Sequence, residues 1–134
     1  MTKAAANQEL KRDFARHREQ TLIQKERLQS ILQKHGADRT EHTDQAMQAL
    51  IAETDKMIEF LIGDELRDAG LIASAQKLEH YEIAAYGTAS TLAGQLDLRD
   101  DQQILHGILE EEKAADAKLT ELAKRKVNAD ALAA

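Results

Sequence analysis

Apolar side chains recur at helical spacing through almost the whole of this 134-residue chain, and no proline interrupts them. Proline is the strongest helix breaker, because it lacks an amide hydrogen and clashes with the preceding turn. Strong helix formers such as alanine, leucine and glutamate also dominate the composition. The pattern predicts four helices in a single domain, over residues 8–35, 40–62, 64–96 and 98–127. We therefore expect an all-α helical bundle.

The expected boundaries carry capping residues. Gly36 suits the left-handed position just past a helix end, and Asp38 followed by Glu41 forms a capping-box pattern for the second helix. Asp64 can cap the third. Gly70 predicts an irregular turn within that helix, because an interior glycine costs about 1 kcal/mol relative to alanine. Residues 128–134 are expected to form a frayed tail.

Charge and cysteine content narrow the classes of function. A formal net charge of -6 and the lack of an extended basic face argue against a general nucleic-acid binder. Without cysteine, a metal would need oxygen or imidazole ligands. No apolar segment is long enough to span a bilayer, and the first residues lack the apolar core of a signal peptide. We expect a soluble, cytoplasmic protein that binds neither nucleic acid nor membrane.

Polar side chains interrupt the apolar face of three predicted helices. In the third helix, Glu79 lies about 20° from both Ile72 and Tyr86 when residues are spaced at 100°. In the fourth, Glu112 lies about 20° from Leu105 on an otherwise apolar face. The middle of the first helix is polar for two turns of its inward face. The bundle is therefore expected to contain a polar layer at mid-length.

A bound metal would explain acids at these positions. Burying a lone carboxylate costs several kcal/mol unless it is protonated, paired or bound to a cation. Helical bundles can hold di-iron or di-manganese centres between carboxylates on facing helices. The candidate metal ligands are Glu79, Glu82, Glu112 and Asp116. Candidates for weaker or outer positions are His17, Gln24, His80, Tyr81 and Tyr86.

An interpretation without metal stays open for several of these residues. Acids on a bundle face often lie at its edge and pair with lysine or arginine, which would suit Glu82 and Asp116 equally well. His17 also fits a hydrogen-bonded core or rim histidine, and Tyr86 fits core packing. The other acids around Glu112 are expected to be solvated.

Sequence motifs give little support to other chemistries. The chain contains no glycine-rich phosphate loop, no cysteine nucleophile and no serine with a convincing base partner. The Glu-x-x-His pattern of di-iron bundles is also missing, since the matching places read Thr21-x-x-Gln24 and Glu112-x-x-Ala115.

Two long stretches, AQKLEHYEIAAYGT (75–88) and LEEEKAADAKLTELA (109–123), resemble the YciE/YciF-type ferritin-like stress proteins. The resemblance extends upstream through RHREQTLIQKERLQSIL (16–32). It implies a ferritin-like bundle, a dimer, induction under general or osmotic stress in bacteria, and a carboxylate-rich site for iron or manganese. The implied ligands are Glu79 and Glu82 in EHYE and Glu112 and Asp116 in EEKAAD, with Gln24 near the site.

One departure from that family shapes the expected assembly. Its members begin with a further long helix that supplies a carboxylate, so the segment 40–62 would here be the crossover element. Three remaining core helices would expose an apolar seam, which predicts a homodimer or larger homo-oligomer.

Two functions stay open: a metal-binding stress protein, with at most a di-metal oxidase or peroxide-consuming activity, and a non-catalytic structural protein that works through self-association.

Overall fold

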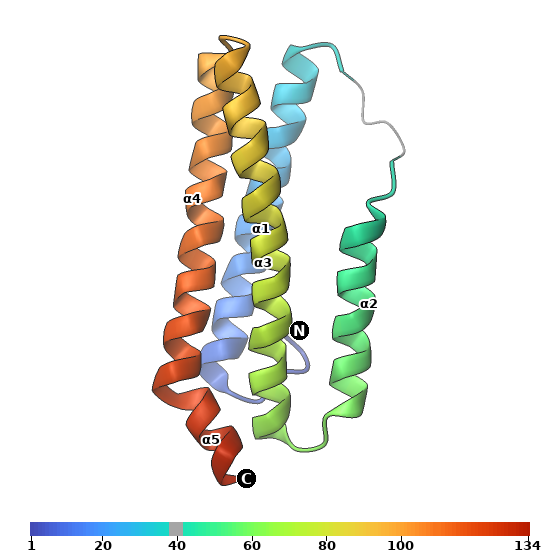
Figure 1. The fold of residues 1–134 in the computed structure, drawn as a ribbon, viewed down its shortest axis with the longest axis vertical. Coiled ribbons are helices and arrows are strands. Elements are labelled where there is room, and N and C mark those ends of the chain that lie inside the picture. Colours follow the sequence, from blue (N-terminus) through green and yellow to red (C-terminus); the bar gives the residue numbers. More distant parts are fainter. Residues whose placement is uncertain (38–41) are drawn as a thin grey trace.

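The computed structural model describes residues 1–37 and 42–134, and these are almost entirely helical. The elements are α1 (Gln8–Lys34), α2 (Gln45–Phe60), α3 (Asp64–Gln95), α4 (Arg99–Leu122), the π-helical turn η1 (Ala123–Val127) and α5 (Asn128–Ala133). Figure 1 shows α1, α3 and α4 as long rods side by side, with α2 standing outside and packing on α3. The expected all-α bundle is confirmed. In the described residues, no helix is both long enough and apolar enough to cross a bilayer.

Side chains and glycines define the helix ends. Asn7 caps α1 by accepting from the amides of Glu9 and Leu10. Asp44 caps α2 by accepting from the Met47 amide at 3.0 Å, so α2 begins later than residue 40. The expected capping box of residues 38 and 41 lies outside the described residues. The cap of α3 is Gly63, with φ of 99°. Asp64, expected to cap that helix, is instead its first residue, where its charge favours the helix dipole.

Two further expectations about the helices are wrong. α3 continues without a break through Gly70. Met57 and Leu61 pack directly against the helix backbone at this glycine, in the space that a side chain would fill, and this packing supports the helix there. The tail is helical to Ala133 rather than frayed. Val127 is buried in the core at the end of η1, and α5 contacts α3, so packing holds the tail in place.

A continuous apolar core joins the start of α1, the first part of α3, the end of α4 and η1, segments that lie at the lower end of the bundle in Figure 1. Its main side chains are Leu10, Phe14, Leu71, Ile72, Ala75, Leu119, Leu122 and Val127. Further along the helices, buried apolar residues continue at Ala93, Leu105, Ile108 and Leu109. The buried polar residues Gln24, Glu79 and Glu112 lie between these two regions. The expected polar layer therefore crosses the bundle at mid-length.

Two buried carboxylates fix the position of α1 along the bundle. Near its start, Asp68 of α3 accepts from the backbone amides of Ala6 at 2.8 Å and Asn7 at 2.7 Å. At its end, Asp101 of α4 accepts from the Lys34 ammonium at 3.0 Å and contacts the His35 ring nitrogen at 2.5 Å. Since both ends are held, the middle of α1 faces a defined level of α3 and α4.

Candidate metal centre

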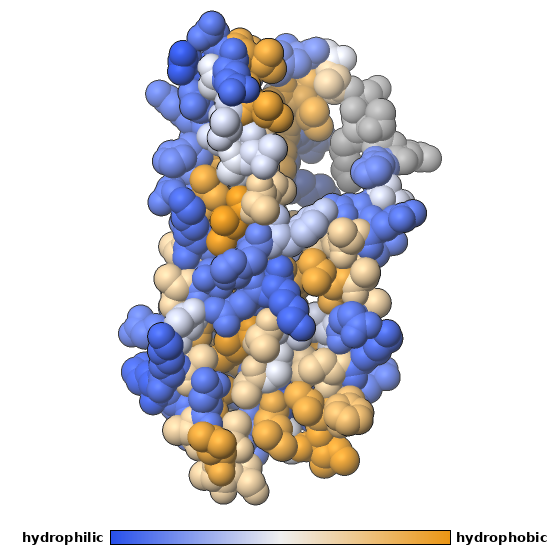
Figure 2. Space-filling view, viewed as in Figure 1, coloured by the Kyte–Doolittle hydropathy of each residue, from blue (hydrophilic) through white to orange (hydrophobic). Residues whose placement is uncertain are grey.

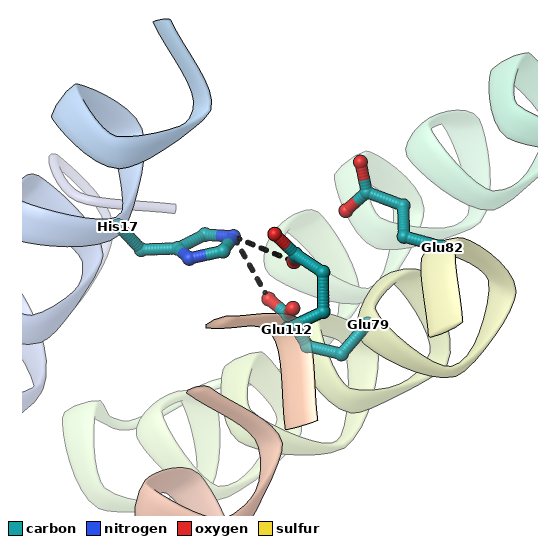
Figure 3. A group of neighbouring side chains, drawn as sticks. All are labelled: His17, Glu79, Glu82 and Glu112. Carbon is teal, nitrogen blue, oxygen red and sulfur yellow. Dashed lines mark ion pairs between the residues drawn. The ribbon is translucent and has the colours of Figure 1, made fainter. Parts of the chain in front are cut away.

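Four side chains from three helices converge in the polar layer. His17 comes from α1, Glu79 and Glu82 come from adjacent turns of α3, and Glu112 comes from α4. Each offers one ligand atom, and all of these atoms lie within 4.8 Å of one another. Figure 3 shows the His17 ring pointing at the carboxylates. The spacing of Glu79 and Glu82 places them on one helix face, where both can reach the same point.

The imidazole lies against the two most deeply buried acids. His17 Nε2 is 3.0 Å from Glu79 Oε1 and 3.8 Å from Glu112 Oε2. Glu79 is 3% exposed and Glu112 is 0% exposed. Bulk water cannot solvate carboxylates at this depth, so protons, hydrogen bonds or a cation must compensate their charge.

Burial and mutual repulsion perturb the acid–base properties of the cluster. Burial, a hydrogen bond with Glu79 and the charge of Glu82 raise the pKa of Glu112 to about 8. Burial, and then the charge of Glu79, raise the pKa of Glu82. The hydrogen bond to Glu79 raises the pKa of His17. Without a cation, the site therefore retains protons at pH values where isolated glutamates have lost theirs.

Gln24 is a buried partner of Glu112. Its Nε2 donates to Glu112 Oε1 and, at 3.0 Å, to Glu111 Oε2. Arg27 contacts the other oxygen of Glu111 at 2.8 Å. Glu111, expected to be solvated, is partly exposed, with 26% of its side chain accessible, and the amide of Gln24 and the guanidinium of Arg27 both reach it. Gln24 and Arg27 lie one turn apart on α1, so both side chains can reach the same carboxylate of α4.

The structure places Asp116 apart from the glutamate cluster, although the motif groups them. Its Oδ1 accepts from Gln76 Nε2 at 3.0 Å, and its Oδ2 lies 3.3 Å from His80 Nε2. Asp116 lies one helical turn beyond Glu112, or about 6 Å along the axis. His17, which the sequence placed in the outer group, lies within the cluster instead. The structure thus separates Asp116 and His80 as a second polar pair.

The two tyrosines lie differently with respect to the cluster. Tyr86 is partly buried, and burial together with the charges of Glu82 and Glu112 raises its pKa to about 12. Tyr81 points elsewhere, because its hydroxyl donates to Asp44 at 2.7 Å.

The donor atoms of the cluster fit a first-row divalent cation. When both acids are ionised, Glu79 Oε2 and Glu112 Oε2 are buried and no hydrogen-bond donor reaches them. Buried oxygens of this kind normally have a partner, and a cation would provide one. Three carboxylates and one imidazole form a ligand set suited to iron, manganese or zinc. Ligands about 2.1 Å from such an ion lie about 3 to 4 Å apart, so a small inward movement would complete the coordination.

Comparisons with other proteins agree with the helical architecture. Residues 1–132 match a family described as "Domain of unknown function (DUF892)". Protein YciF of Escherichia coli K12 is 44% identical over 129 residues, which are 96% of this chain and 78% of that protein. The crystal structure of the E. coli stress protein YciF matches with a TM-score of 0.89, covering 95% of this chain and 80% of that chain. The structure of YcfI from Rhodopseudomonas palustris matches with a TM-score of 0.85 at 36% identity, over 89% of this chain and 76% of that one. That protein is described as having a proposed structural role.

Proposed function

This chain belongs to the DUF892 family, and from that premise we propose that it is a ferritin-like protein that binds iron or manganese between its helices. The proposed ligands are His17, Glu79, Glu82 and Glu112. The supporting observation is the meeting of three carboxylates and an imidazole, with two buried carboxylate oxygens that have no hydrogen-bond donor when both acids are ionised. A cytoplasmic location, in keeping with the lack of cysteine, forms part of the same proposal.

Binding of a cation would replace the protons that the cluster otherwise keeps. Glu112 would lose the proton that burial favours, and His17 would lose the Nε2 proton that it shares with Glu79. Gln24 would hold Glu112 in place through its amide. When bound, iron or manganese supplies Lewis acidity and one-electron redox chemistry. Binding should therefore release protons and strengthen with rising pH.

A stress role is the physiological setting that we propose for this site. A relative with 44% identity is described as a stress protein. Sequestration of a redox-active cation by buried carboxylates is a function that this geometry can serve without a further substrate site. We therefore propose that the protein binds such a cation under stress.

Anaerobic Fe(II) titration of the wild type and variants tests this function. The Glu79→Ala/Glu112→Ala double variant should bind much less Fe(II) than the wild type. Asp116→Ala should keep wild-type binding, because Asp116 pairs with Gln76 and His80. Glu110→Ala, which removes an exposed acid paired with Lys113, is the matched control. Equal binding by the wild type and the double variant would contradict the proposal.

A structural role through self-association is the second candidate function. The R. palustris relative is described as having a proposed structural role. Phe60, the last residue of α2, and Ile62, which lies between α2 and α3, are 82% and 86% exposed. Figure 2 shows apolar side chains gathered at the lower end of the molecule, where α2 gives way to α3. An exposed apolar surface of this kind favours a homodimer or larger homo-oligomer.

Light scattering over a range of protein concentrations tests that second function. The wild type should have at least twice the monomer mass, and Phe60→Ser/Ile62→Ser should reduce it. A stable wild-type monomer at high concentration would contradict self-association. Because Fe(II) binding is measured separately, the two functions can succeed or fail independently.

A further inference from the structure

The second ring nitrogen of His17 faces away from the carboxylates. Nε2 contacts Glu79 and Glu112, whereas Nδ1 is buried and has no hydrogen-bond partner. One turn earlier on α1, Asp13 has the same feature at Oδ2. Its other oxygen, Oδ1, pairs with the Lys118 ammonium of α4. A possible donor and a carboxylate acceptor are therefore both unpartnered on one face of α1, four residues apart.

Both side chains line one cavity between α1 and α4. The cavity has a volume of about 160 Å³ and also borders Phe14, Glu79 and Leu119. A water molecule occupies about 30 Å³ in the liquid, so there is room for one beside the polar wall. Buried polar atoms are seldom left without any partner, and a bridging water can satisfy two at once.

We propose that Asp13 is a positioning residue for His17: its Oδ2 accepts, through a water in this cavity, the proton carried on Nδ1. This hydrogen bond would leave Nε2 as the ring atom that faces Glu79 and Glu112. Lys118 would keep the carboxylate in place through Oδ1. The role in metal binding rests on the proposed function, whereas the orientation of the ring does not.

The orientation of the His17 ring decides which of its two nitrogens can bind a cation. In the metal-free protein, Nε2 shares a proton with Glu79 and Nδ1 donates toward Asp13. A cation among the carboxylates can replace only the Nε2 proton, since Nε2 is the ring atom that contacts Glu79 and Glu112. Histidine ligands nearly always donate their other ring N–H to a carboxylate, a carbonyl or a water. In this chain, the α1 helix would supply that carboxylate from its own preceding turn.

Nitrogen-15 NMR of the metal-free protein tests the orientation directly. The wild type should show a slowly exchanging Nδ1–H signal for His17, which is assigned by its loss in His17→Gln. Asp13→Ala should lose the signal, and Asp13→Asn should recover it in part, because the amide oxygen can still accept. Glu9→Gln is the control, since it removes one negative charge from the preceding turn at an exposed pair with Arg125. An unchanged signal in Asp13→Ala would overturn the inference.

Zn(II) affinity, measured by competition with a chelator, tests the effect on the site. Loss of an outer-shell partner typically weakens metal binding about 10- to 100-fold, which is the range expected for Asp13→Ala. Asp13→Asn should lie nearer the wild type, and Glu9→Gln should match it. Equal weakening in Asp13→Asn and Asp13→Ala would mean a charge effect and would overturn the positioning role. If the wild type binds no Zn(II), the proposed function fails, and the NMR result alone decides the role of Asp13.

Discussion

Replacing Glu112 by glutamine should stabilise the metal-free protein, although the residue lies in the centre of the proposed site. The substituted amide is close in shape to a protonated glutamate. Its oxygen can still accept from Gln24, and its NH₂ group can donate to Glu79, the partner of the protonated acid. The substitution therefore removes the cost of a buried acid while leaving its hydrogen bonds in place.

The magnitude follows from the raised pKa of Glu112. The pKa of this group is about 8 in the folded protein and 4.5 in an ordinary glutamate. Between these values the unfolded chain has lost the proton and the folded chain keeps it, so the free energy of unfolding falls as pH rises. The fall is about 1.4 kcal/mol for each pH unit, or about 4 kcal/mol between pH 5 and pH 8. The raised pKa of His17 acts in the same direction above its usual pKa of 6.5.

Urea unfolding at pH 5, 6.5 and 8, with a chelator present, measures this effect. The variant should gain on the wild type as pH rises, reaching an advantage of about 4 kcal/mol at pH 8 relative to pH 5. Glu110→Gln, an exposed acid whose pKa is lowered by Lys113, should show no such gain. A wild type that is more stable than Glu112→Gln at pH 8, or whose stability does not fall with pH, would refute the reasoning.

Urea unfolding also measures how the packing of α2 and the anchor of α1 contribute to the free energy of unfolding. Gly70→Ala should leave the free energy of unfolding nearly unchanged, because the side-chain ends of Met57 and Leu61 must shift to admit the new Cβ, which offsets the gain in helix propensity of about 1 kcal/mol. Gly87→Ala, with nothing within 4 Å, should instead stabilise by up to about 1 kcal/mol, and equal effects at the two glycines would contradict this account of α2 packing. Asp68→Ala should cost about 3 kcal/mol, since two backbone amides lose a charged acceptor, and a loss below about 0.5 kcal/mol would show that this anchor is unimportant.

The fold could be predicted from the sequence because its determinants are local. Helical periodicity, the lack of proline and the breaks at Gly36 and Gly63 together define the long helices. The end of the chain was harder to predict, because its helix depends on tertiary packing. Val127 is held in the core, and this contact cannot be recognised from the alanine-rich segment that follows.

Helical periodicity predicted only part of the geometry of the candidate site. It gives the direction in which a side chain points, so the inward placement of Glu79 and Glu112 could be predicted. It does not give the level at which one helix faces another. Asp116 lies on the correct side of α4, yet it lies opposite Gln76 and His80 instead of the cluster.

The level of α1 is set by contacts that the sequence does not mark. Asp68 and Asp101 hold its two ends, and this fixes His17 beside Glu79. Neither anchor stands out in the sequence, because each depends on atoms more than sixty residues away. For the same reason, the bridging of Glu111 and Glu112 by Gln24 needed the three-dimensional structure.

Anomalous diffraction from crystals grown with Mn(II) would locate an ion bound by the cluster. We expect one anomalous peak inside the bundle, about 2.0 to 2.3 Å from His17 Nε2 and from carboxylate oxygens of Glu79, Glu82 and Glu112. The peak should be missing in Glu79→Ala/Glu112→Ala crystals. A wild-type map without a peak at this point, or with its peak between Asp116 and His80, would contradict metal binding by His17, Glu79, Glu82 and Glu112.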